Sequence, residues 1–197
     1  MLASIHPLGE RSRRQRWGLT ASAFVAGTVA GAGLLASALG SLGARLPPLG
    51  IGAALAVAAL AVVGVALDAR LAGASVPTVR RQVDEQWLAR YRGWVYGGGF
   101  GFQLGLGVVT VVSSFTVYLA FALAFLSGSP ARGLAVGAVF GLVRGGTILA
   151  AAGVRTPDQL HRLHRRVAAW DGATRRLAVG VQAAVAVGGG MAAAARW

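Results

Sequence analysis

Long stretches without a charged residue are the feature that most restricts how this chain can fold. Five stretches of 28, 22, 39, 22 and 19 residues follow one another along the sequence, and the fourth is interrupted by one charge, Arg144. A helix needs about 20 apolar residues to cross the hydrocarbon core of a bilayer. We therefore predict an all-α polytopic membrane protein with a single transmembrane domain over residues 1–197. Its five predicted spans lie at about 18–41, 49–67, 96–127, 133–153 and 177–195.

The third stretch, of 39 residues, is long for one pass. A re-entrant hairpin would return the chain to its starting side and would place the next arginine-rich loop outside. One long, tilted or broken pass over 96–127 is therefore favoured. Its first half is dense in glycine, which is compatible with a break there; these residues are Gly97, Gly98, Gly99, Gly101, Gly105 and Gly107.

The arginines set the predicted orientation. All 19 basic residues are arginine, against six acidic residues, which gives a net charge of +13. Fifteen arginines lie in the N-terminal segment and in the loops after the second and fourth spans. Because cytoplasmic loops carry the excess of basic residues, we predict the N-terminus inside and the C-terminus outside a bacterial-type plasma membrane. The charges form blocks between spans, so no nucleic-acid binding is expected.

The N-terminal segment has a second interpretation as a cleaved signal. Arg13 and Arg14 resemble a twin-arginine pair, and the Ala-Ser-Ala sequence at 36–38 resembles a cleavage site. The hydrophobic stretch is longer than the roughly 7–15 residues of a usual signal core. Arg16 also stands where an apolar residue is expected after the arginine pair. A retained first span is therefore preferred.

Two predicted cytoplasmic segments, 76–92 and 157–171, have helical amphipathic patterns. In the second, Thr156, Pro157 and Gln159 fit an N-terminal capping box. Its apolar face consists of Leu160, Leu163, Val167 and Trp170, and five basic or imidazole side chains lie beside that face: His161, Arg162, His164, Arg165 and Arg166. We expect both segments to lie in the interface, with their arginines on anionic lipid head groups. Docking of a cytoplasmic partner is the alternative.

A weak internal repeat is visible. Trp17 and Trp94 each open a long predicted helix just after arginine, and the glycine spacing of 27–33 resembles that of 101–107. The plan is an outward helix, an inward helix and an amphipathic loop, twice over, followed by a final helix. Many transporters are built from repeats, although glycine-rich helices also match one another by chance.

Arg144 is the one charge inside a predicted span. A charge at the centre of a span costs about 2.5–3.5 kcal/mol on insertion scales and indicates function by default. No acidic residue lies inside any span, and Asp68, at the inner end of the second, is too shallow to pair with it. Thr28, Gln103 and Arg144 each lie eleven or twelve residues from a flanking arginine. We expect them at similar depth as substrate-binding residues, or else as groups that satisfy Arg144 and hold helices together.

Small residues form stripes on two of the predicted spans. The fourth span has glycine at every fourth position, at Gly133, Gly137, Gly141 and Gly145. The fifth has Gly180, Ala184 and Gly188. Such stripes allow close helix packing, either within the chain or against a second copy.

Residues 103–110 (QLGLGVVT) and 140–146 (FGLVRGG) resemble glycine-rich helices of small bacterial membrane proteins in the thiol-electron-carrier and amino-acid-exporter superfamily, the CcdA/DsbD and LysE group. The resemblance covers the third and fourth spans and implies a transport-like scaffold. The electron-carrier branch needs a membrane cysteine pair, which this chain lacks. That superfamily also usually has six helices in inverted triplets, against the five predicted here. Thiol redox activity is therefore not carried over.

Composition excludes several kinds of activity. The chain has no cysteine, which excludes disulfides, thiolate metal sites and cysteine nucleophiles. His161 and His164 have a spacing that can share a metal, but neighbouring arginines repel a cation, so no metal site is expected. The sequence has no paired-carboxylate site, nucleotide loop or supported Ser–His–Asp arrangement. We expect no catalytic residues, no cofactor and no enzyme activity.

The leading hypothesis is a small transporter-like inner-membrane protein that binds or moves a small, anionic solute. Arg144 would contact the anion, with Gln103 and Thr28 as polar neighbours. At this size it is expected to act as a homo-oligomer or with a partner membrane protein. The alternative is a non-catalytic subunit or assembly factor of a larger membrane complex, with glycine faces in the bilayer and arginine-rich helices on a cytoplasmic partner.

Overall fold

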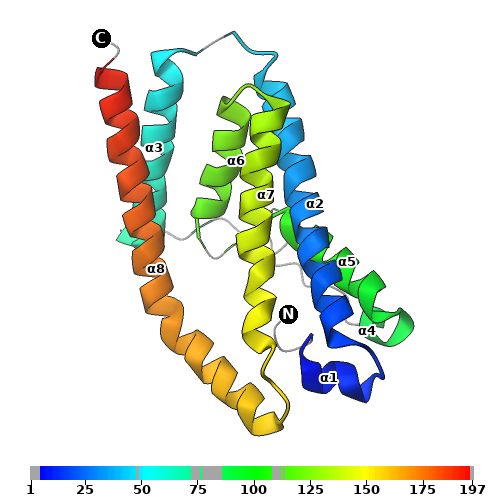
Figure 1. Ribbon diagram of the computed structural model, residues 1–197. Coiled ribbons are helices and arrows are strands. Elements are labelled where there is room, and N and C mark those ends of the chain that lie inside the picture. Colours follow the sequence, from blue (N-terminus) through cyan, green and yellow to red (C-terminus); the bar gives the residue numbers. More distant parts are fainter. Residues whose placement is uncertain are drawn as a thin grey trace.

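The computed structural model describes residues 5–47, 49–71, 76, 86–107, 112 and 114–195. Over these residues, all regular secondary structure is helical (Figure 1). The elements in chain order are α1 (Pro7–Ser12), α2 (Trp17–Gly43), α3 (Ile51–Asp68), α4 (Gln86–Arg90), α5 (Gly93–Gly105), α6 (Thr116–Leu126), α7 (Pro130–Gly146), the 3₁₀ helix η2 (Thr147–Ala151) and α8 (Pro157–Ala194).

Four described helices are long and apolar enough to cross a membrane. They are α2, α3, α7 continued by η2, and α8. They overlap the first, second, fourth and fifth predicted spans. The chain therefore has the architecture of a helical membrane protein, as its uncharged stretches predict. The number of crossings and the orientation stay predictions.

The third predicted span, 96–127, consists of two shorter helices. α5 ends at Gly105, and Gly107 adopts a positive φ of 68°, which glycine reaches without steric cost. α6 then begins at Thr116. Both helices run in the same direction along α2, because Gly97 of α5 lies beside Thr20 and Phe125 of α6 lies beside Gly43. This arrangement agrees with the prediction of one broken pass over 96–127, and the crossing itself stays a prediction.

α8 joins two segments that the sequence separated. The amphipathic segment 157–171 and the span 177–195 form one continuous helix. No proline interrupts 171–177, and the single Gly172 does not end the helix. The capping box at Thr156 is confirmed: its hydroxyl accepts the Gln159 backbone N–H, and the Gln159 side chain accepts the Thr156 N–H. The other amphipathic segment, 76–92, lies largely outside the described residues, and α4 forms near its end.

The helices pack in two groups (Figure 1). α2 contacts both α5 and α7, and α3 pairs with α8. α6 contacts α2, α3 and α7 and so joins the groups. We call α2, α5 and α7 the glycine core, and α3 with α8 the outer pair. One buried apolar cluster centres on Phe24, Tyr96 and Phe100, and a second on Ala36, Val117 and Phe121.

Candidate functional site

The regularly spaced glycines of α7 lie against α2. The buried residues of α7 are Gly133, Gly137, Gly141 and Gly145. A Cβ atom at Gly137 would clash with the backbone carbonyl of Ala32, and one at Gly133 with that of Ala36. Only glycine allows two backbones to approach this closely. The stripe therefore packs within the chain rather than against a second copy.

α5 carries a second glycine stripe that packs on a different face of α2. Its members, again four residues apart, are Gly93, Gly97, Gly101 and Gly105. A Cβ atom at Gly101 would overlap the carbonyl of Phe24. The density of glycine in this region indicated a break, and the helix does end directly after the stripe. The glycines themselves serve close packing.

Thr28 lies where the two stripes meet. It is fully buried, and its hydroxyl donates to the carbonyl oxygen of Phe24 at 2.8 Å. Its own carbonyl faces Gly105 of α5 and Gly141 of α7, while its side chain faces Gly145. Backbone from two neighbouring helices encloses Thr28, and its hydroxyl proton is used within α2. The geometry is that of a packing residue shared by three helices.

Arg144 and Gln103 lie at the level of Thr28 along α2. Gln103 is between two glycines that contact α2, and Arg144 precedes the glycine beside Thr28. Both side chains are half-buried. The Arg144 guanidinium lies over the ring of Phe140, 5.6 Å from its centroid, and Phe140 packs edge-to-face on Phe121. No hydrogen bond in the described part of the chain joins Thr28 to Gln103. Thr28 therefore lies within α2, while Gln103 on α5 and Arg144 on α7 lie on the helices that pack against it.

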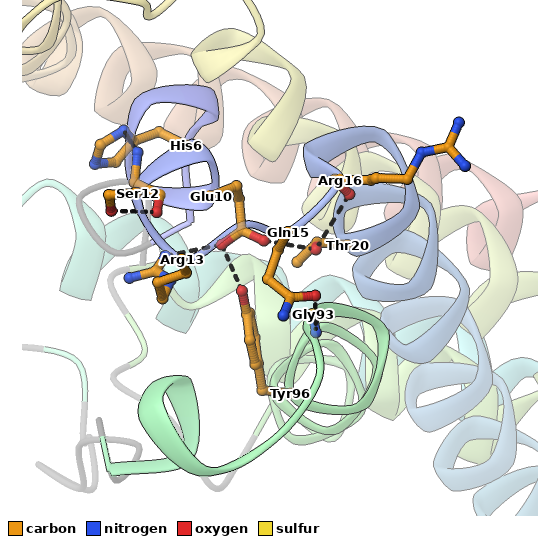
Figure 2. Close-up of polar contacts among 10 residues, drawn as sticks. His6, Glu10, Ser12, Arg13, Gln15, Arg16, Thr20, Gly93 and Tyr96 are labelled. Atoms are coloured by element: carbon orange, nitrogen blue, oxygen red, sulfur yellow. Dashed lines mark hydrogen bonds and ion pairs between the residues drawn. The ribbon is translucent and has the colours of Figure 1, made fainter.

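Glu10 is a fully buried carboxylate at the start of the glycine core, shown in Figure 2. It accepts hydrogen bonds from the Arg13 guanidinium at 2.8 Å, the Thr20 hydroxyl at 2.7 Å and the Tyr96 hydroxyl at 2.5 Å. Thr20 lies on α2 and Tyr96 on α5. One carboxylate in α1 therefore ties the first turns of two core helices together.

Two further contacts fix the same corner of the molecule (Figure 2). The side-chain oxygen of Gln15 accepts the backbone N–H of Gly93, the first residue of α5, at 3.1 Å. Nδ1 of His6 accepts the backbone N–H of Gly9 and caps α1. Burial lowers the pKa of Arg13, but its hydrogen bond to Glu10 and the charge of Glu10 raise it, and the net pKa lies above the ordinary value. Arg13 thus remains the counter-charge of Glu10.

Asp68, the last residue of α3, is the second buried carboxylate. The backbone N–H of Phe115 donates to both of its oxygens, at 3.0 and 3.1 Å. The Ser114 hydroxyl and the Gln182 amide nitrogen each donate at 2.7 Å. An anion next to the first turn of α6 is also favoured by the helix dipole. Neutral donors thus hold α3, α6 and α8 together around one carboxylate.

Pattern-based interpretation missed both carboxylate sites. Glu10 lies outside every predicted span, and Asp68 entered the argument only as an unsuitable partner for Arg144. Gln182 was the available signal, because it is the only strongly polar residue in the last uncharged stretch. The same reasoning that selected Gln103 would have selected Gln182.

The small-residue stripe of α8 is open, in contrast to those of the glycine core. Within the described part of the chain, no atom lies within 4 Å of a Cβ placed at Gly180 or Gly188, and Ala184 is exposed. Gly189, the next residue along, packs against Ala54 and Ala58 of α3. α8 therefore uses one face for α3 and leaves the stripe uncovered.

Comparison with known proteins gives one likeness. The chain is 32% identical over 147 residues to the methylamine utilization protein MauF of Paracoccus versutus. The alignment covers 73% of this chain and 54% of that relative, so the chain spans about half the length of the curated protein it matches. No protein-family model and no solved structure matches the chain.

Proposed function

We propose that this chain is a non-catalytic inner-membrane protein that serves methylamine utilization through contact with a partner protein. The process is suggested by the similarity to MauF, which extends over 73% of the chain. The enclosure of Thr28 by α5 and α7 is the observation that favours a partner-binding protein over a solute transporter. A solute site at this level needs space beside α2, and glycine backbone of α5 and α7 lies there instead.

The positive charge of methylamine also argues against its transport through the glycine core. A primary alkyl amine is protonated at neutral pH, as a lysine side chain is. Cationic ligands are recognised by carboxylates or by aromatic faces. At the level of Thr28 the charged group is the guanidinium of Arg144, which repels a cation. Glu10 and Asp68 each already accept hydrogen bonds from three residues.

The open stripe of Gly180, Ala184 and Gly188 offers a surface for a partner's transmembrane helix. Small residues let helices approach closely in lipid, where packing drives association. The stripes of α5 and α7 are occupied by α2, whereas the stripe on α8 has room for a neighbour. A partner helix seated there would make the chain a subunit or an assembly factor.

The test uses a deletion strain of the source organism, grown on methylamine. We expect growth to be lost and to be restored by the wild-type chain. Gly188→Leu should fail to restore growth and should abolish co-purification of the partner. Gly190→Leu is the matched control, because it also has open space on α8 but faces another direction. Normal growth of the deletion strain would contradict a role in methylamine utilization. Rescue by Gly188→Leu would contradict the open stripe of α8 as the partner-binding surface.

Transport of a small anion is the second candidate, and the half-buried Arg144 is the observation that favours it. The transport hypothesis expects Arg144→Gln to abolish flux in reconstituted vesicles while the protein still assembles. Under the partner-contact proposal, the same variant supports growth on methylamine whenever it folds.

A further inference from the structure

A small pocket of about 210 Å³ lies where the chain turns from η2 into α8. One wall comes from the turn and presents Ala150 and Val154. The facing wall comes from the first turns of α8 and presents Gln159, Arg162, Leu163 and Arg166. The pocket therefore combines two guanidinium groups with an apolar lining, and no carboxylate lines it.

Neither arginine forms an ion pair within the described part of the chain. The ion pairs there are Arg13 with Glu10 and Arg175 with Asp171, and neither involves the pocket. Arg162 and Arg166 are one helical turn apart, a spacing at which like charges repel by a few tenths of a kcal/mol. An anion between them removes this repulsion. Guanidinium groups also bind phosphate oxygens in a bidentate manner.

Gln159 adds a neutral donor to the same wall. Its side-chain oxygen accepts the backbone N–H groups of Arg155 at 2.7 Å and Thr156 at 3.2 Å. These bonds fix the amide group and leave its nitrogen as a donor for a ligand. The two guanidinium groups and one amide N–H form a set of hydrogen-bond donors suited to a phosphate group.

We propose that this pocket binds the phosphate group of an anionic phospholipid. The volume is below the roughly 300–1,000 Å³ typical of sites that enclose a whole small molecule, and it suits a head-group phosphate whose acyl chains lie outside. Exposed apolar residues adjoin the lining residues along the chain: Leu149 precedes Ala150 and is 57% exposed, and Trp170 follows Arg166 by one helical turn and is 66% exposed. Trp is enriched at membrane interfaces.

The site is independent of the proposed partner surface. It lies at the first turns of α8, whereas Gly188 is near the other end of the same helix. The pocket also lies at the predicted cytoplasmic boundary, where anionic lipids create a negative surface potential that attracts basic residues. Lipid bound here would hold α8 against the end of α7.

The test measures lipid bound to the full-length protein in phosphatidylcholine nanodiscs with and without phosphatidylglycerol. The double variant Arg162→Gln/Arg166→Gln should bind phosphatidylglycerol about tenfold more weakly, which corresponds to about 1.4 kcal/mol. Like Arg162 and Arg166, Arg165 and Arg176 are exposed arginines of α8, but they do not line the pocket. The control Arg165→Gln/Arg176→Gln removes the same charge and should bind normally. Native mass spectrometry counts the bound lipid, and thermal unfolding verifies that both variants fold.

Three results would overturn the proposal. Equal loss of lipid in both double variants would show a general charge effect rather than a site. Unchanged binding in the pocket variant would show that Arg162 and Arg166 do not hold the lipid. Displacement of phosphatidylglycerol by millimolar glycerol 3-phosphate or inorganic phosphate would identify a soluble phosphate ligand instead of a lipid.

Discussion

The glycine core and the outer pair solve the same packing problem in different ways. In the core, α5 and α7 each have four glycines, one at every fourth position, and these glycines let both helices pack closely on α2. In the outer pair, α3 and α8 meet through alanines and through Gly189, whose surroundings leave more space. Backbone contact tolerates almost no added atoms, whereas side-chain contact can adjust. We therefore expect Gly137 in the core to tolerate an added methyl group less well than Gly189 in the outer pair.

One buried carboxylate is bound to each region, Glu10 of α1 to the glycine core and Asp68 of α3 within the outer pair, and the two have different hydrogen-bond partners. Glu10 pairs with the cationic Arg13, while Asp68 accepts hydrogen bonds from neutral groups of α6 and α8. Removing one partner of a buried ion pair leaves an uncompensated charge. Removing a carboxylate bound by neutral donors leaves unsatisfied N–H and O–H groups, which costs less per group.

The largest effect is expected for Gly137→Ala in the glycine core. The added Cβ would overlap the carbonyl of Ala32, and the α2 and α7 backbones would have to separate. Overpacking of this kind costs about 3 kcal/mol. Reversible unfolding in mixed detergent micelles measures the loss. Gly146→Ala is the control on the same helix, because no described atom lies within 4 Å of that position. Equal stability of the two variants would contradict the close contact.

Asp68→Ala should have the next largest effect. The backbone N–H of Phe115, the Ser114 hydroxyl and the Gln182 amide would lose their acceptor, at a cost of about 2 kcal/mol. Asp68→Asn keeps one acceptor oxygen and should recover about half of this loss. The same unfolding measurement checks both variants. If Asp68→Asn proves as unstable as Asp68→Ala, charge rather than hydrogen bonding holds α3, α6 and α8 together.

Gly189→Ala repeats the glycine substitution in the outer pair and should cost much less than Gly137→Ala. A Cβ there would lie 3.0 Å from the Ala54 carbonyl oxygen and 3.2 Å from the Ala58 Cβ. A shift of a few tenths of an ångström relieves such contacts, so we expect a loss of about 1 kcal/mol. A loss as large as that of Gly137→Ala would remove the distinction between the two regions.

Thr28→Val should have the smallest effect. The hydroxyl of Thr28 donates only to the carbonyl of Phe24 in its own helix, and valine has a similar shape, so the expected loss is below about 1 kcal/mol. Growth on methylamine should be unchanged. If the Thr28→Val variant is stable but does not support growth, the result would favour the prediction that Thr28 binds a substrate.

The sequence predicts the helices of this protein better than it predicts their contacts. Uncharged length locates α2, α3, α7 and the second half of α8, because a bilayer imposes a minimum span on any apolar helix. The fourfold spacing of Gly133 to Gly145 also predicts a packing face. The neighbour of that face depends on tertiary structure, which spacing within one helix does not encode.

The polar sites depend even more on distant residues. Glu10 meets Tyr96 across 86 positions, and Asp68 meets Gln182 across 114 positions. No local pattern joins such pairs. The depth argument for Thr28, Gln103 and Arg144 placed them at one level along α2, but rotation of each side chain about its helix axis decides whether they meet. Depth follows from counting residues along each helix, whereas the direction of a side chain depends on packing.

The continuity of α8 has a mechanical consequence. A helix of 38 residues is about 57 Å long, nearly twice the thickness of the hydrocarbon core. Its hydrogen bonds run without interruption from the arginine-rich end to Met191. The arginine-rich segment and the apolar segment that packs on α3 are therefore joined without a loop. A change in the position of one segment is expected to displace the other, because no loop between them absorbs the movement.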